Sequence, residues 1–217
     1  MPATVLLDAL GTLVELERPW PHLVTELQAR GVVVSEEQAR AAMLAEMAYY
    51  RAHHDEAGDW PGLKDLRRRC AAVVQERLGV ALPLDDVLDA LLGAIRFRAY
   101  PEVPEALARL RARGARLAVV SNWDSSLHDV LERTDLRRLV DAVVISAEEG
   151  VAKPDPRIFR IALERLGAET AGALHVGDSL EHDVAGARAA GLEAVLVARD
   201  GAAVPDGVHT VGSLAEL

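Results

Sequence analysis

Cysteine, lysine and long apolar runs are scarce in this chain of 217 residues. Its single cysteine, Cys70, excludes an internal disulfide and lies in an arginine-rich stretch, which favours packing over reactivity. No apolar run reaches the roughly 18 residues that a transmembrane helix needs, and the first four residues lack the basic region of a signal peptide. We therefore expect a soluble, globular protein of the cytoplasm that has no membrane partner.

Positive charge is also in short supply, because 24 lysines and arginines face 34 aspartates and glutamates, for a formal net charge of -10. Binding to a nucleic acid backbone relies on a basic surface, so this balance argues against nucleic acid as a partner. The one basic cluster, Arg67-Arg68-Arg69, is expected to form a solvated helix face. Lysine occurs only as Lys64 and Lys153, which makes each of them more informative than usual.

A short apolar run near the N-terminus, residues 4–7, ends abruptly in the carboxylate of Asp8. The run is too short for a helix, and Gly11 then allows the backbone to turn before the hydroxyl of Thr12. Asp8 is therefore predicted at the carboxyl end of a buried strand, which is the edge of an α/β sheet where ligands bind. The alternative is an aspartate that only caps a turn.

Residues 16–98 differ in character from the rest of the chain. They contain a succession of amphipathic helical patterns separated by turn signals, with no convincing strand. The sequence Ser35-Glu36-Glu37-Gln38 is a capping box at the start of the second pattern. A run of helices without strands predicts a separate helical bundle inserted after the first strand. We expect helices at 19–30, 36–53, 63–78 and 84–97.

From residue 100 onward, helical and β-rich patterns alternate strictly. This alternation predicts a parallel sheet with right-handed crossovers and helices on both faces, a Rossmann-like α/β core made of residues 1–15 and 99–217. We expect strands at 116–120, 142–145, 173–176, 193–198 and 208–211, and helices at 101–113, 124–133, 156–166 and 181–190.

Three of the predicted strands end in polar side chains. These are Asp8, Ser121 with Asn122, and Asp178, and a later connection carries Lys153. In a parallel sheet all of these groups meet at one edge. Each residue alone has an ordinary explanation, such as a surface lysine or a helix cap. Together they place two carboxylates, a hydroxyl and an ammonium in one cleft, which predicts an active site.

Four segments of the chain resemble the motifs of the haloacid dehalogenase-like hydrolase superfamily, in the right order and over essentially the whole chain. They are Asp8-Ala9-Leu10-Gly11-Thr12-Leu13, Val119-Val120-Ser121-Asn122, Lys153-Pro154-Asp155-Pro156, and His175-Val176-Gly177-Asp178-Ser179 with Asp183 beyond it. The helical insert at 16–98 resembles the C1 cap of subfamily I.

The resemblance implies that Asp8 is a nucleophile that forms a covalent aspartyl intermediate. It also implies that Asp8, Asp178 and the backbone carbonyl of Leu10 hold Mg²⁺, a hard ion that prefers oxygen ligands. Asp183 would orient Lys153 or a metal-bound water.

The same resemblance assigns binding of the transferred group to Ser121, to the backbone amide of Asn122 and to Thr12. Lys153 would neutralise charge on the nucleophile and the substrate. Arg51, in the helical insert, is a candidate for receiving a departing halide or a phosphate. The expected partner is a small-molecule substrate, a phosphorylated metabolite or a halo-acid. The sequence does not indicate the oligomeric state.

One position departs from the pattern of phosphatases in this superfamily. They carry a second aspartate two residues after the nucleophile, as general acid and base, where this chain has Leu10. A leucine cannot transfer protons, which is an assistance worth ~10²- to 10⁴-fold. Phosphomonoester hydrolysis is favoured because the metal carboxylate Asp178 is present, whereas dehalogenation would explain Leu10. A phosphonatase using Lys64 fits poorly, and a member that binds a ligand or partner and catalyses little remains an alternative.

Overall fold

A parallel sheet organises the larger part of the structure, a computed structural model that describes residues 3–199, 201 and 206–217. In this described part the sheet has six strands in the order β5-β4-β1-β6-β7-β8, and each pairing in it is parallel. This arrangement confirms the predicted α/β class. The strands are β1 (Thr4–Leu7), β4 (Arg116–Ser121), β5 (Ala142–Ile145), β6 (Ala173–Gly177), β7 (Glu193–Val197) and β8 (His209–Val211).

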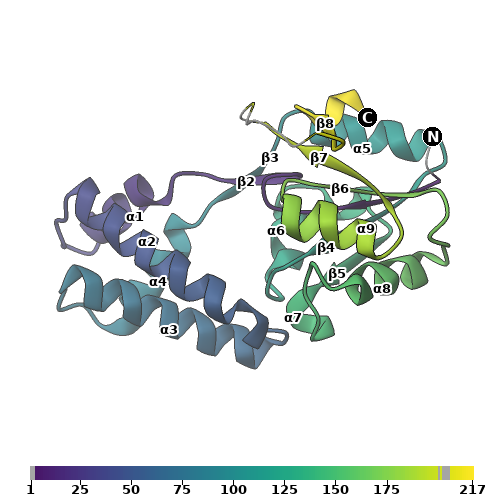
Figure 1. Ribbon diagram of the computed structural model, residues 1–217. Coiled ribbons are helices and arrows are strands. Elements are labelled where there is room, and N and C mark those ends of the chain that lie inside the picture. Colours follow the sequence, from purple (N-terminus) through teal and green to yellow (C-terminus); the bar gives the residue numbers. More distant parts are fainter. Residues whose placement is uncertain (1–2, 200, 202–205) are drawn as a thin grey trace. The chain divides into compact units, whose positions relative to one another are not determined.

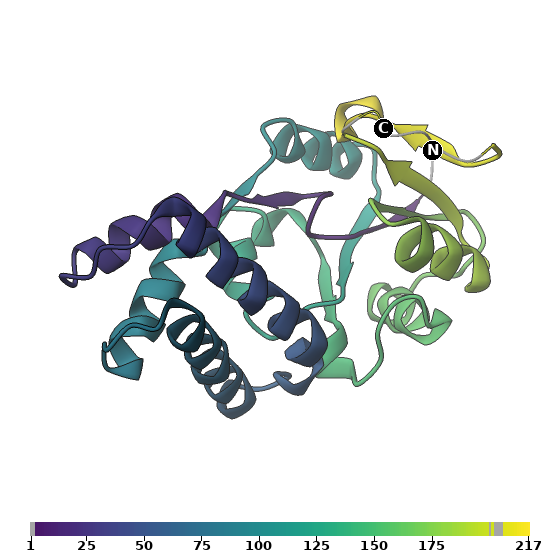
Figure 2. The ribbon, with the colours of Figure 1, turned by 60° about the vertical axis from the view of Figure 1, so that its left-hand side comes forward.

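Helices cover both faces of this sheet. Leu6 of β1 and Val120 of β4 belong to one core cluster with Phe159 of a helix that follows β5. Successive side chains of a strand point to opposite faces, so the buried Leu7 and Val119 face the other side. In Figure 2 the green helices α8 and α9 lie on one side of the sheet and the teal α5 on the other. The helices are α5 (Val103–Ala112), α6 (Leu127–Arg133), α7 (Ser146–Glu149), α8 (Pro156–Leu166) and α9 (Gly186–Ala189), with the short turns η2 (Arg137–Leu139) and η4 (Leu214–Glu216).

The segment after β6 differs from the single helix expected at 181–190. It begins with a π-helix, η3 (Leu180–Ala185), which continues into α9. Both Asp183 and Val184 donate their backbone N–H to the carbonyl of Ser179, at 3.0 and 3.1 Å. Asp183 lies within this wider turn, and such turns are frequent at functional sites.

The chain divides into two compact units, Met1–Glu15 with Arg98–Leu217, and Leu16–Phe97. It leaves the first unit along β2 (Val14–Leu16) and returns along β3 (Phe97–Ala99), and the two strands pair with each other (Figure 1). The expectation of a helix through residue 97 is wrong, because the helix ends at Ala94. Strand β3 pairs with residues more than 80 positions away in the sequence, and local periodicity carries no sign of such a partner.

The unit Leu16–Phe97 is helical and has its own hydrophobic core, which includes Leu23, Met43 and Leu66. Its elements are α1 (Pro19–Gln28), α2 (Glu36–His53), η1 (His54–Glu56), α3 (Trp60–Leu78) and α4 (Leu84–Ala94). The predicted capping box is present at Ser35, whose hydroxyl accepts the N–H of Gln38 at 3.1 Å. Among the described residues, no helix is long and apolar enough to cross a membrane. The expected identity of this unit as a C1 cap stays a prediction.

Candidate active site

Asp8 follows directly after β1 and is almost fully buried. Its backbone N–H donates to the carbonyl of Val176 on the neighbouring strand β6, at 2.9 Å. The chain then turns sharply. Gly11 has a positive φ of 81°, a conformation that favours glycine, and its N–H donates to the carbonyl of Val14 at 2.8 Å. The strand end and the turn together fix where the Asp8 carboxylate lies.

Lys153 supplies a buried cation beside that carboxylate. Its Nζ lies 2.6 Å from Oδ1 of Asp8 and 2.6 Å from Oδ1 of Asp183. Burial acts to lower the pKa of Lys153, but the two carboxylates outweigh it and raise that pKa above its usual value. Lys153 is therefore an ammonium ion at neutral pH, held between two carboxylates.

Asn122 holds the loop that carries Lys153. Its side-chain oxygen accepts the backbone N–H of Lys153 at 2.7 Å, and its side-chain N–H donates to the carbonyl of the same residue at 2.9 Å. Ser121, the last residue of β4, donates its hydroxyl to Oδ1 of Asp8 at 3.1 Å. The polar ends of β1 and β4 and the loop after β5 are thus brought together, as the parallel topology predicts.

Asp183 is anchored through both of its carboxylate oxygens. Oδ1 accepts from Lys153 and lies 2.8 Å from Nε2 of His175, and Oδ2 accepts the N–H of Ser179 at 2.9 Å. Burial acts to raise the pKa of Asp183, but Lys153 and His175 hold it well below its ordinary value. A Cβ on Gly177 would lie 2.1 Å from Cγ of Asp183, so a glycine is needed there. Asp183 is therefore in direct contact with Lys153, and the expected role of Asp183 in orienting Lys153 or a metal-bound water stays a prediction.

His175 lies beneath this carboxylate in the middle of the sheet. It is fully buried, as its place in a predicted strand suggested, and its ring meets that of Phe159 edge-on at 4.9 Å. Within the described residues, Nδ1 of His175 has no hydrogen-bond partner. We therefore place the proton on Nε2, which donates to Asp183.

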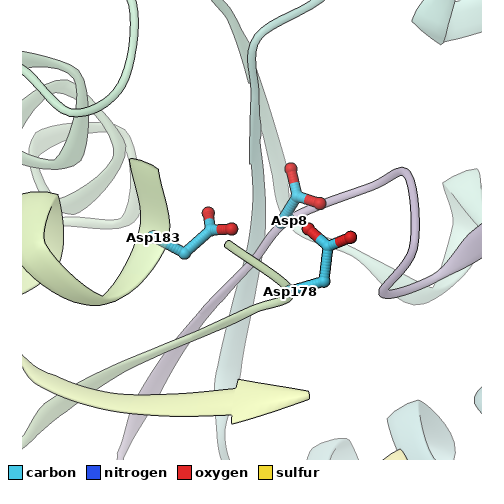
Figure 3. A group of neighbouring side chains, drawn as sticks. All are labelled: Asp8, Asp178 and Asp183. Atoms are coloured by element: carbon cyan, nitrogen blue, oxygen red, sulfur yellow. The ribbon is translucent and has the colours of Figure 1, made fainter. Parts of the chain in front are cut away.

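Asp178 is the exposed carboxylate of the group. Partial burial, together with the negative charges of Asp8 and Asp183, raises the pKa of Asp178 to about 6. Asp8, Asp178 and Asp183 offer oxygen atoms that lie within 4.8 Å of one another. Figure 3 shows the carboxylates of Asp8 and Asp178 next to each other, with Asp183 pointing toward them from a separate turn.

This donor set fits a hard divalent cation such as Mg²⁺, because it consists of clustered carboxylate oxygens. Both oxygens of Asp183 already accept hydrogen bonds. Asp8 and Asp178 are therefore better suited as direct ligands than Asp183. The side chain of Leu10 is 45 % exposed and offers neither a ligand nor a proton, so only the backbone carbonyl of Leu10 remains as its expected contribution.

Two of the predicted residues stand apart from these contacts. Thr12 is fully buried, and its hydroxyl oxygen has no hydrogen-bond partner in the part of the chain that the structure describes. Arg51 is exposed on α2, in the unit Leu16–Phe97. The substrate-binding roles expected for Thr12 and Arg51 stay predictions.

One residue near the site carries no motif signal. Arg199 lies two positions beyond the end of β7 and donates hydrogen bonds to the backbone carbonyls of Gly11 and Thr12, in the turn that follows Asp8. The only indication in the sequence is its position just after a strand, at the edge of the sheet where the other groups gather. The bonds between the side chain of Asn122 and the backbone of Lys153 were not predicted either.

The chain combines a parallel α/β core with a buried Asp-Lys-Asp arrangement at the carboxyl edge of its sheet. Comparisons with known proteins identify the class of protein that has these features. Residues 2–191 match the family model described as haloacid dehalogenase-like hydrolase. Haloacid dehalogenase-like hydrolase domain-containing protein 3 of Mus musculus is 33% identical over 231 aligned positions, which cover 97% of this chain and 90% of that protein. The phosphoserine phosphatase of Thermus thermophilus is 41% identical over 128 positions, 56% of this chain and 51% of that protein.

Solved structures that are similar to this chain belong to the same class of protein. A HAD phosphatase from Thermococcus onnurineus has a TM-score of 0.68 at 27% identity and covers 100% of this chain and 95% of that one. A 2-haloacid dehalogenase from Pseudomonas syringae has a TM-score of 0.68 at 24% identity, covering 100% and 96%, and this likeness concerns the fold alone. The chain belongs to the haloacid dehalogenase-like hydrolases and is a hydrolase. Members of this family generally use Mg²⁺.

Proposed function

We propose that the protein is a Mg²⁺-dependent phosphomonoester hydrolase that works through an aspartyl phosphate on Asp8. The observation that carries the proposal is the set of contacts around Asp8. Its Oδ1 accepts hydrogen bonds from Lys153 and Ser121, and Asp178 offers an oxygen close by. The phosphatases among the relatives, such as the Thermus thermophilus enzyme, support the same substrate class.

In the first step, the second oxygen of Asp8, Oδ2, attacks the phosphorus of the ester. A bond forms between this oxygen and phosphorus, and the bond from phosphorus to the leaving-group oxygen breaks. Lys153 keeps Asp8 in place and offsets negative charge as it develops on the phosphoryl oxygens. Ser121 and the backbone N–H of Asn122 are the further donors proposed for these oxygens. Mg²⁺, when bound at Asp8 and Asp178, supplies charge neutralisation between the carboxylates and the phosphoryl group.

In the second step, water attacks phosphorus and the bond between phosphorus and Asp8 breaks. Inorganic phosphate leaves, the proton lost by the water passes to phosphate or solvent, and Asp8 returns as a carboxylate. Leu10 cannot protonate the leaving group or take the proton from water. We therefore expect slow turnover and a preference for activated leaving groups, such as phenolates, which depart without a proton.

Dehalogenation through an ester on Asp8 is the second candidate function. Leu10 favours it, because a halide leaves without a proton, whereas Asp178 favours phosphoryl transfer. The third candidate is a family member that binds a ligand and catalyses little.

Purified protein should be assayed on an aryl phosphate and on 2-chloropropionate, each with and without Mg²⁺. We expect release of inorganic phosphate that requires Mg²⁺. Halide release without metal would overturn the proposal of a phosphatase in favour of dehalogenation. Inactivity on both substrates would favour the third candidate, a protein that binds a ligand and catalyses little.

A further inference from the structure

The guanidinium group of Arg199 donates hydrogen bonds to the turn that follows the proposed nucleophile, Asp8. Its Nε donates to the carbonyl of Gly11 at 3.1 Å, and its Nη2 donates to the carbonyl of Thr12 at 2.8 Å. Two neighbouring carbonyls are thus held by one planar fork, a geometry that a lysine cannot reproduce. This contact joins residues that are about 190 positions apart in the sequence.

The far side of the same guanidinium group is fixed as well. Nη1 of Arg199 donates to a carboxylate oxygen of Glu102 at 2.7 Å, and the group lies 3.4 Å from the ring centroid of Tyr100. Glu102 is ionised, because the hydrogen bond from Arg199 lowers its pKa despite the opposing effect of burial. The charge of Arg199 is therefore matched by Glu102, and Arg199 acts on the turn through the backbone.

The turn held in this way lies against a proposed metal ligand. A Cβ atom added to Gly11 would lie 2.0 Å from Oδ2 of Asp178, so the backbone of the turn is packed directly against that carboxylate. The same turn includes Leu10, whose carbonyl is a proposed ligand, and it begins at Asp8. A displacement of the turn by about 1 Å would separate groups that must act together, and such displacements cost about 10²-fold in rate.

We propose that Arg199 is a positioning residue that holds the turn at residues 9–13 against Asp178 and so keeps the cation-binding groups together. The inference rests on the proposed function as far as it concerns the metal. It assigns Arg199 no contact with substrate. Loss of the side chain should loosen the turn locally and weaken cation binding without unfolding the sheet.

The test compares the wild type with R199A and with R109A as a matched control. Arg109 also donates to two backbone carbonyls, those of Ala215 at 2.9 Å and Leu214 at 3.4 Å, and these belong to η4 instead of the turn after Asp8. Hydrogen exchange of the peptide covering residues 6–14 is measured by mass spectrometry, and Mn²⁺ binding is measured by electron paramagnetic resonance.

We expect R199A to accelerate exchange in residues 6–14 and to weaken Mn²⁺ binding, whereas R109A changes neither. Unchanged exchange in that peptide would overturn the proposal, and so would equal acceleration throughout the sheet, which marks a general structural role. Unchanged Mn²⁺ affinity in R199A would overturn it too. If R199A does not fold, R199K, which keeps the charge and loses the fork, is measured in its place. A wild type that binds no Mn²⁺ contradicts the proposed function, while the exchange data still decide the role of Arg199.

Discussion

Lys153 and Asp8 form an ion pair with a separation of 2.6 Å in which both side chains are more than nine-tenths buried. Water cannot replace either partner at this depth, so each group depends on the other for its charged form. The protonation state of Asp8, the proposed nucleophile, is therefore coupled to the stability of the core. Lys153 also bonds to Asp183, which makes the effect of removing it larger than for a simple pair.

Replacing Lys153 with methionine should cost both activity and stability. Two buried carboxylates would lose their cation, and breaking a buried pair in this way costs about 3–5 kcal/mol. We expect the aryl phosphatase rate to fall by about 10²- to 10³-fold. The variant K153M/D183N should regain part of the stability and none of the activity, and K64M, which changes the exposed second lysine, should leave both intact. Denaturant unfolding and initial rates test this, and full activity in K153M would contradict it.

Replacing Gly11 with alanine should weaken cation binding beyond the effect of backbone strain. The new methyl group would meet Asp178 Oδ2 at 2.0 Å. Gly150 provides the control, because it also has a positive φ, 64°, but nothing lies within 4 Å of an added Cβ. Both variants should lose about 1 kcal/mol of stability to strain. Only G11A should bind Mn²⁺ more weakly, and equal Mn²⁺ affinities in the two variants would refute the close approach.

Glu46 should make the stability of the helical unit dependent on pH. It is 4 % exposed in the core of that unit, and burial raises its pKa from 4.5 to about 7, with Cys70 acting in the opposite direction. The folded protein therefore holds this proton more tightly than the unfolded chain. The contribution of Glu46 to stability should therefore fall as pH rises from 4.5 to about 7, a loss that corresponds to about 3 kcal/mol.

The variant E46Q should remove this dependence. It should match the wild type near pH 4.5 and exceed its stability at pH 8, whereas E76Q, at an exposed position of α3, should behave like the wild type throughout. Denaturant midpoints at the two pH values measure the difference. A difference in stability between wild type and E46Q that is the same at both pH values would contradict this prediction, because it would show that Glu46 is ionised in the folded protein at little cost.

Introducing a carboxylate at Leu10 should supply the missing acid and base. The side chain is 45 % exposed, so L10D is not expected to disturb the core. We expect a gain of about 10²- to 10⁴-fold on alkyl phosphates, measured as phosphate release. L180D, which adds a carboxylate at the exposed Leu180 beyond Asp178, should give no gain. An unchanged rate in folded L10D would mean that the missing acid is not what limits turnover.

The sequence predicted the sheet and the gathering of polar groups because both follow from local patterns and one topological rule. Asp8, Ser121 and Asp178 each end a recognisable strand, and parallel strands bring their carboxyl ends to one edge. Lys153 was predicted from its motif, and the structure places it between Asp8 and Asp183.

Contacts between distant segments were not predictable in the same way. Arg199 meets Gly11 and Thr12 through backbone carbonyls, which leave no mark on residue types. Strand β3 pairs with β2, and the whole helical unit lies between these two strands in the sequence. The π-helix that carries Asp183 was not predicted either, and in it Asp183 contacts Lys153 and His175, which lie in other segments of the chain.

The most direct test of an aspartyl phosphate on Asp8 is rapid-quench kinetics with an aryl phosphate and Mg²⁺, followed by borohydride reduction and peptide mass spectrometry. Because Leu10 cannot activate water for the second step, the intermediate should accumulate. We predict a burst of about one equivalent of aryl alcohol per chain and conversion of Asp8 to homoserine by the reductant. Phosphate release without a burst, with Asp8 unmodified after reduction, would contradict it.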